Sequence, residues 1–479
     1  MVFFPGAKFS EDEERTPETP QVSVFCDENA DFARAKVTIA IGDISVTAEH
    51  TEQRIKSKAK IKTEKVAIGA AFLKAGEKFF KYSPSWGILT GVRPTKIVRD
   101  LLEKGAGVTE IRTILTKQYF LNPKKATLLM NIAQTEHKKI KALGDGDTCS
   151  VYISIPFCPS RCSYCSFISY ATKRLISLIP DYLDMLEKDI RKTFALIKEL
   201  GYRVSTVYIG GGTPSILDEA QISRLLGIVS EVTDVSALDE YTFEAGRPDT
   251  VTAEKLKAVR DGGVSRICIN PQTLNDSVLE NIGRAHTAED FYRAFDIAKN
   301  SGIDCINTDL IAGLPGESFT SWQGTVDEII RLRPDNVTVH TFCVKRAADI
   351  VKNDRDVFSR TGGGVGKCVD FAQLEAKNAG YIPYYMYRQK NTVGNFENVG
   401  FALDGKEGLY NIYMMEEIHS IFSVGAGAVT KMVSPDRSDI RRVASPKYPY
   451  EYLGDDHDER LEVMFEKLRK FRDEYPAEK

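Results

Sequence analysis

From about residue 148 onward, short apolar runs alternate with longer amphipathic stretches. The apolar runs predict six strands, at 151–156, 205–212, 241–246, 265–271, 305–313 and 336–342. Between them, segments such as SWQGTVDEIIRLRP place apolar residues every three or four positions, which predicts helices. Strands joined by helices at this spacing are expected to be parallel, with right-handed crossovers. Six such units predict an α/β fold, a partial (β/α)6 TIM-like barrel with functional groups at the carboxyl ends of its strands.

The two ends of the chain follow different patterns. Residues 1–147 begin with the alternating segments VSVFCDE, KVTIAIG and ISVTAEH, which predict strands, and continue with helical stretches as far as the loop GDGDT. From about residue 381 the chain is rich in tyrosine and glycine, and it ends in the charged helical segment ERLEVMFEKLRKFRDEY. We therefore expect an N-terminal α+β extension over 1–147, a barrel core over 148–380 and a C-terminal domain over 381–479.

Composition narrows the class of protein. Hydrophobic residues make up 42% and charged residues 27% of the chain, as in a soluble globular protein. The formal net charge of −3 argues against general binding to nucleic acid. No stretch reaches the roughly 20 apolar residues of a membrane span, and the first residues lack the basic region and cleavage site of a signal peptide. We expect a cytoplasmic protein whose nine cysteines do not form disulfides.

Three of the nine cysteines lie close together, directly after the first predicted barrel strand. The segment IPFCPSRCSYCSF contains Cys158, Cys162 and Cys165 in the spacing C-x3-C-x2-C. Thiolates suit zinc or an iron–sulfur cluster. Structural zinc normally takes four ligands, and no histidine lies nearby to complete the set. A [4Fe–4S] cluster held by three cysteines would leave one iron open to a chelating cofactor. The spacing favours such a cluster, and zinc or unligated cysteines are the alternatives.

With Tyr164 as the aromatic residue before the third cysteine, this motif resembles the signature of the radical S-adenosylmethionine (SAM) superfamily. The resemblance implies that the amino and carboxylate groups of SAM chelate the open iron. One electron from the cluster then splits SAM into methionine and a 5′-deoxyadenosyl radical, which abstracts hydrogen from the substrate. Because this radical is the oxidant, no catalytic acid–base pair of the protein is expected. The resemblance also implies an oxygen-sensitive cluster and use under anaerobic conditions.

Further segments resemble the coproporphyrinogen oxidase-like branch of that superfamily. YIGGGTPS, at the end of the second strand, resembles its SAM-amine motif, although a glycine run alone more often marks a tight turn. YTFEAGRPDT, GVSRICINPQTLND, NIGRAH and INTDLIAGLPGES resemble later motifs of the same branch. By this resemblance the residues on the SAM side are Tyr152, Tyr164, Gly211, Gly212, Thr213, Glu244, Gln272, Arg284 and Asp309.

The segments GILTGVRPTKIVRDLLEKG and YYMYRQKNTVGNFENVGFA resemble the HemZ-type coproporphyrinogen dehydrogenases within this branch. The implied reaction is the oxygen-independent oxidative decarboxylation of coproporphyrinogen III to protoporphyrinogen IX in heme biosynthesis. It implies an external electron donor of the flavodoxin or ferredoxin type and an electron acceptor. Arg346 and Arg388 are candidate partners for substrate propionates, because arginine offers a two-pronged fit to carboxylate. Solvated surface charge is the alternative for both residues.

Two positions depart from the best-known oxidases of this branch. Ser154 stands where those enzymes have histidine, and Phe167 replaces a fourth cysteine. Related proteins with phenylalanine at that position include proteins that bind or deliver heme. Two alternative functions therefore stay open: a heme-binding chaperone on the same scaffold, and a radical SAM methyltransferase that acts on heme.

Overall fold

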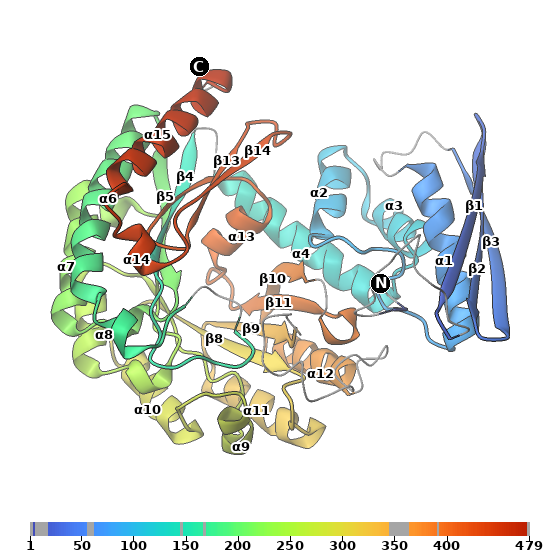
Figure 1. Cartoon of the computed structure of the whole chain (residues 1–479). Helices are drawn as coiled ribbons and strands as arrows, with labels where there is room; N and C mark the ends of the chain where they lie inside the picture. Colours follow the sequence, from blue (N-terminus) through green and yellow to red (C-terminus); the bar gives the residue numbers. More distant parts are fainter. Residues whose placement is uncertain are drawn as a thin grey trace. The chain divides into compact units, whose positions relative to one another are not determined.

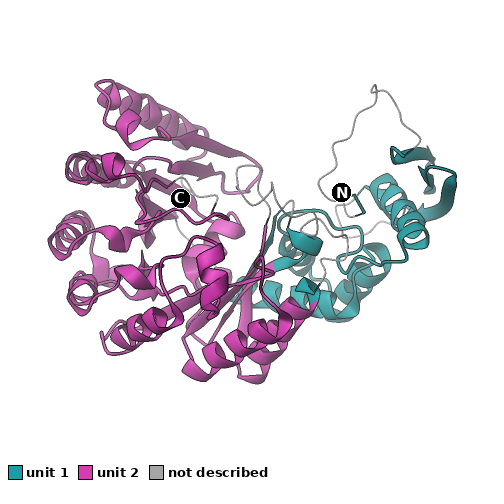
Figure 2. Cartoon of the chain, turned by 60° about the horizontal axis from the view of Figure 1, so that its bottom comes forward, with its two compact units in different colours: residues 1–138, 355–366, 386–397 teal, residues 139–354, 367–385, 398–479 magenta. Residues whose placement is uncertain are grey.

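The computed structural model describes residues 3–4, 18–54, 62–143, 147–165, 169–343, 364–389 and 392–476. The chain divides into two compact units (Figure 2). Unit 1 consists of residues 1–138, 355–366 and 386–397. Unit 2 consists of residues 139–354, 367–385 and 398–479.

Unit 1 contains an antiparallel sheet of three strands, β1 (Gln21–Glu28), β2 (Phe32–Ile41) and β3 (Ile44–Gln53). Every second residue of the central strand β2, from Ala33 to Ile39, is buried, because one face of the sheet packs against helix α1 (Thr63–Phe80). The unit continues with α2 (Thr95–Glu103), α3 (Val108–Thr113), the π-helix η1 (Ile114–Gln118) and α4 (Pro123–Ala142).

The core of unit 2 is a run of six parallel strands, as the sequence pattern predicts. They are β4 (Thr148–Ile155), β5 (Arg203–Gly211), β6 (Glu240–Glu244), β7 (Arg266–Cys268), β8 (Cys305–Ala312) and β9 (Asn336–Thr341). They lie side by side in chain order, and each pairs in parallel with the next. The described strands do not close into a barrel, since β4 and β9 pair with further strands on their outer sides.

Helices connect these strands and lie along one side of the sheet (Figure 1). The α-helices are α5 (Lys173–Ile176), α6 (Ile179–Glu199), α7 (Glu219–Val232), α8 (Ala253–Asp261), α9 (Asp276–Asn281), α10 (Ala288–Lys299) and α11 (Phe319–Leu332). Three short 3-10 turns lie between them: η2 (Pro214–Ile216), η3 (Val235–Ala237) and η4 (Pro248–Thr250). None of the helices in the described part of the chain combines the length and apolar character that a bilayer crossing requires.

The strands after residue 380 extend the same sheet on both sides. β10 (Ile382–Arg388) and β11 (Glu397–Ala402) lie beyond β9, while β12 (Ser420–Val424), β13 (Val429–Val433) and β14 (Ile440–Ala444) lie beyond β4. β12 is parallel to β4, and β11 is antiparallel to β9. The remaining elements are α12 (Val365–Asn378), η7 (Val393–Asn395), α13 (Leu409–Met415), α14 (Pro449–Tyr452) and α15 (His457–Glu474).

Strand β7 is shorter than the pattern predicts, ending at Cys268 rather than at residue 271. Pro271 has no N–H to donate to a neighbouring strand. The next residue, Gln272, has a φ of 69°, a left-handed conformation that a strand cannot accommodate. Regular strand pairing therefore stops after Cys268, and only an isolated parallel bridge joins Gln272 to Leu310 on β8. This irregular segment lies at the carboxyl edge, where functional groups are expected.

Candidate functional site

The three cysteines lie in the loop that follows β4. Tyr170 anchors this loop on both sides, because its carbonyl accepts from the N–H of Cys158 at 3.1 Å and its N–H donates to Pro156 at 2.9 Å. The N–H of Cys165 donates to the carbonyl of Cys162 at 3.1 Å, which forms a turn. Cys158 and Cys162 are buried and Cys165 is half-buried. The sequence C-x3-C-x2-C is therefore presented from one anchored loop.

The thiols of this loop have polar neighbours. The Cys158 sulfur lies 3.3 Å from the Thr213 hydroxyl oxygen. Burial raises the pKa of the Cys158 thiol, while the hydroxyls of Thr213 and Ser169 and the charge of Arg247 oppose that rise. Across the described residues, no three His, Cys, Asp or Glu side chains are gathered in a metal-binding arrangement. The three thiols thus share one short loop without forming a closed metal site.

The glycine run at the end of β5 packs against the start of this loop. The N–H of Gly212 donates to Ile155 at 2.8 Å, and the N–H of Thr213 donates to Phe157 at 2.7 Å. A Cβ on Gly212 would lie 2.4 Å from the Phe157 carbonyl oxygen, and Gly211 has a φ of 110°. The N–H groups of Gly212 and Thr213 are therefore used within the protein. The glycines are needed because two backbone segments approach closely.

Glu244, at the end of β6, lies beside this glycine run. It accepts hydrogen bonds from the Tyr208 hydroxyl and from the N–H of Gly211. Burial raises the pKa of Glu244 to about 7; the Tyr208 hydrogen bond opposes this rise and the nearby charge of Asp309 adds to it. Tyr208 also stacks on the predicted SAM-side residue Tyr152, with ring centroids 6.0 Å apart.

Asp309 on β8 is held by a residue that the sequence analysis missed. The Asn270 side-chain amide donates to Asp309 Oδ2 at 3.0 Å, and the N–H of Asp309 donates to Asn270 Oδ1 at 3.1 Å. His340 at the end of β9 lies 3.6 Å from Asp309 Oδ2 through its Nε2. Asn270 belongs to the quoted segment GVSRICINPQTLND, two residues before Gln272, and this position is the signal that could have identified it.

Two further predicted residues carry buried polar atoms without a partner. Gln272 is 8% exposed, and its Oε1 has no hydrogen-bond partner among the described residues. Arg284 is 7% exposed; it donates to the carbonyls of Gly246 and Asn270, but its Nε is also without a partner within the described part of the chain. An unpaired buried donor or acceptor is costly unless a ligand completes it. These atoms, together with the carboxylates, fit a polar cofactor such as SAM.

The predicted SAM-side residues are therefore neighbours in unit 2. Tyr164, between the second and third cysteines, is half-buried close to Arg284, and loss of solvent contact raises the pKa of its phenol. Thr213 contacts Cys158, and Gly211 contacts Glu244. The carboxyl ends of neighbouring parallel strands lie at one edge of the sheet, and this arrangement brings segments distant in sequence together.

Of the two arginines predicted to pair with substrate propionates, the structure describes only Arg388. Arg388 lies in unit 1 and is 3% exposed. It donates to the carbonyls of Leu89 at 2.6 Å and Asn395 at 3.2 Å, and its guanidinium lies 4.9 Å from the centre of the Trp86 ring. These contacts pack Arg388 within unit 1, and its pairing with a substrate propionate stays a prediction. Arg346 lies outside the described residues, as does Phe167.

Comparison with known proteins agrees with this site. The family model of the radical SAM superfamily matches residues 152–329. The oxygen-independent coproporphyrinogen-III oxidase-like protein HemZ of Bacillus subtilis is 36% identical over 424 residues, which cover 86% of this chain and 84% of that protein. The heme chaperone HemW of the same organism is 30% identical over 308 residues, which cover 63% of this chain and 77% of that protein.

Among solved structures, coproporphyrinogen III oxidase (HemN) from Escherichia coli, described as a radical SAM enzyme, matches with a TM-score of 0.49 at 22% identity. The match covers 61% of this chain and 67% of that chain.

The matched segment contains the cysteine loop, the glycine run and the strand-end carboxylates, so the class of protein is a radical SAM protein. Within that superfamily, the chain belongs to the family of oxygen-independent coproporphyrinogen-III oxidase-like proteins. Members of the superfamily bind a [4Fe–4S] cluster and SAM.

Proposed function

We propose that this protein is a radical SAM oxidoreductase that converts coproporphyrinogen III to protoporphyrinogen IX without oxygen. The observation that carries the proposal is the anchored C-x3-C-x2-C loop packed against the glycine run, in a chain 36% identical to HemZ over most of its length. In this reaction each of two propionates loses one hydrogen atom from its β-carbon, releases CO2 and gives one electron to an external acceptor. A vinyl group remains.

Cys158, Cys162 and Cys165 would hold the [4Fe–4S] cluster, because thiolates are its usual protein ligands and these three share one loop. Once bound, the cluster and SAM supply a one-electron oxidant that can remove hydrogen from an unactivated carbon. The protein contributes the binding and orientation of these groups and the exclusion of water.

The polar residues at the carboxyl edge would bind and orient SAM. Glu244 would pair with the SAM ammonium group when its carboxyl is ionised. Asp309, fixed by Asn270, would accept hydrogen bonds from ribose hydroxyls. Gln272 and Arg284 would use their unpaired Oε1 and Nε atoms on the same cofactor. Each role uses a group that the protein leaves buried or incompletely paired.

A heme chaperone is the second candidate, because the chain is also 30% identical to HemW across 77% of that protein. This function predicts stable binding of heme by the purified protein. It also predicts no formation of vinyl groups from coproporphyrinogen III.

The decisive experiment is anaerobic reconstitution with iron and sulfide, followed by incubation with SAM, a low-potential reductant, coproporphyrinogen III and an electron acceptor. Mass analysis should show the loss of two CO2 together with 5′-deoxyadenosine. Cys162→Ser should abolish both products, whereas Cys26→Ser, at an exposed cysteine of β1, should leave them unchanged. Stable heme binding without vinyl formation would instead identify a chaperone. S-adenosylhomocysteine with a linear tetrapyrrole would identify a heme methyltransferase.

A further inference from the structure

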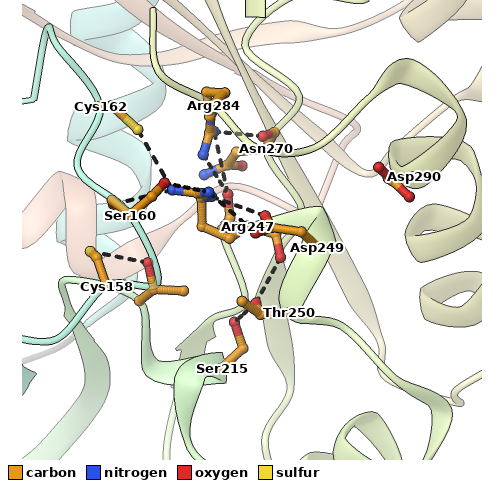
Figure 3. A network of polar contacts seen from close by, with 12 residues as sticks. Cys158, Ser160, Cys162, Ser215, Arg247, Asp249, Thr250, Asn270, Arg284 and Asp290 are labelled. Carbon is orange, nitrogen blue, oxygen red and sulfur yellow. Dashed lines mark hydrogen bonds and ion pairs between the residues drawn. The ribbon is translucent and has the colours of Figure 1, made fainter. Parts of the chain in front are cut away.

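Arg247, in the segment EAGRPDT after β6, is buried directly beside the cysteine loop. It is 3% exposed and lies between that loop and the short turn η4 (Figure 3). A fully buried guanidinium is costly unless its charge and its donors have partners. The groups that contact Arg247 therefore indicate what its positive charge does at this position.

On one side, Arg247 donates to the cysteine loop. One terminal nitrogen lies 3.0 Å from the Ser160 hydroxyl oxygen. The other lies 3.4 Å from the Ser160 carbonyl oxygen and 3.7 Å from the Cys162 sulfur. Arg247 thus holds the middle of the loop and places a permanent positive charge next to a thiol that we assign to the cluster.

On the other side, the same guanidinium pairs with Asp249 through two contacts. Arg247 Nε lies 3.0 Å from Asp249 Oδ1, and a terminal nitrogen lies 3.2 Å from Oδ2. The Thr250 hydroxyl donates to the Arg247 carbonyl at 2.7 Å and fixes the turn. Asp249 therefore offsets part of the charge that Arg247 presents to the thiol (Figure 3).

We propose that Arg247 is a positioning residue that holds the cysteine loop and raises the reduction potential of the bound cluster, and that Asp249 limits this effect. The inference rests on the proposed function, specifically on Cys162 as a cluster ligand. Reduction adds negative charge to a cluster, so a nearby cation and an N–H···S contact favour the reduced form. The effect is strong where water is excluded, because the local dielectric constant is low.

A merely structural Arg247–Asp249 pair predicts a different result. If the pair only fixes the turn, removal of either partner loosens the same loop, and both changes act in one direction. If the charge acts on the cluster, loss of the cation and loss of its counter-charge shift the reduction potential in opposite directions. The direction of the two shifts therefore separates the two roles.

The test compares Arg247→Gln and Asp249→Asn in the full-length protein after anaerobic reconstitution. Arg260→Gln is the matched control, since Arg260 is an exposed arginine at the end of α8 that pairs with Asp261. Iron and sulfide per chain are measured first, and a redox titration followed by electron paramagnetic resonance then gives the reduction potential. For Arg247→Gln we expect at least a tenfold lower ratio of reduced to oxidised cluster at a given potential, a negative shift of about 59 mV. Asp249→Asn should shift the potential in the positive direction, and Arg260→Gln should not move it.

Arg247→Lys keeps the proposal testable if the glutamine variant fails to retain the cluster. Lysine keeps the charge but not the two-pronged donor geometry. We therefore expect less iron per chain but a potential near that of the wild type. Shifts of the same sign in Arg247→Gln and Asp249→Asn, or an unmoved potential in a loaded Arg247→Gln protein, would overturn this inference alone. A wild-type protein that holds no cluster would overturn the proposed function with it.

Discussion

Asn270 and Asp309 hold each other through two reciprocal hydrogen bonds at the carboxyl edge of the parallel sheet. The amide of Asn270 donates to the carboxylate at 3.0 Å, and the backbone N–H of Asp309 donates back at 3.1 Å. His340 Nε2 lies 3.6 Å from the same carboxylate oxygen, Asp309 Oδ2. A carboxylate fixed in this way binds a hydroxyl-rich ligand without first losing rotational freedom.

Asn270→Ala should weaken SAM binding by about tenfold, roughly 1.4 kcal/mol, because Asp309 loses the donor that orients it. The measurement is equilibrium dialysis of SAM against the cluster-loaded protein under anaerobic conditions. Asn300→Ala, at the exposed end of α10, serves as the control. Equal affinities in the two variants would contradict the role of Asn270.

SAM affinity should depend on the ionisation of Glu244. Because the pKa of this carboxyl is about 7 before SAM binds, it is largely neutral below that pH and cannot attract an ammonium group. Affinity should therefore fall by about tenfold per pH unit below pH 7 and level off above it. Calorimetry in buffers of different ionisation enthalpy should detect uptake of a proton by the buffer when SAM binds. Glu244→Gln should bind weakly at every pH, and a pH dependence that survives in this variant would exclude Glu244 as its source.

Gly212→Ala should prevent stable loading of the cluster. The new Cβ would lie 2.4 Å from the backbone oxygen of Phe157, so the start of the cysteine loop would have to move. We expect at least a tenfold loss of iron per chain after reconstitution. Gly227→Ala on α7 is the control, because its Cβ would meet no atom within 4 Å, and alanine should stabilise that helix by about 0.5–1 kcal/mol. Full iron loading of Gly212→Ala would show that the close approach is not required.

His457 should make the stability of unit 2 depend on pH. Its Nε2 lies 2.8 Å from Asp189 Oδ1, and the second oxygen of Asp189 accepts from the Tyr452 hydroxyl. Burial alone lowers the pKa of His457, but the hydrogen bond and charge of Asp189 outweigh it and raise the pKa above 6.5. Because the folded state holds the proton more tightly, this stabilisation is fully present below pH 6.5 and is lost as the pH rises through the raised pKa.

His457→Gln should therefore lower the free energy of unfolding by about 1–2 kcal/mol at pH 6 and by less at pH 8.5. Urea denaturation at the two pH values measures the difference. His137→Gln, a histidine change on α4, serves as the matched control. A destabilisation by His457→Gln that is the same at both pH values would indicate packing rather than ion pairing.

The sequence pattern was sufficient for the parallel core and for the class of protein. Apolar periodicity depends on residues that are close in sequence, and it predicted all six core strands in the order that the structure shows. The early end of β7 was not predicted, because the left-handed Gln272 depends on its contacts with β8. The sequence also did not show whether Arg388 is buried or exposed. Its packing against Trp86 joins segments that are far apart in the chain, so no local pattern predicts it.

The amino-acid sequence by itself determined the cysteine spacing, the alternation of strands and helices, and the membership in the radical SAM superfamily. Each of these depends only on residues that lie close together in the sequence. Only the tertiary structure decided that Arg247 lies on Cys162, 85 residues earlier in the chain. That contact arises because β4, β5 and β6 are parallel neighbours whose carboxyl ends meet at one edge. The charge beside the thiol therefore depends on strand order, which brings together loops that the chain itself keeps far apart.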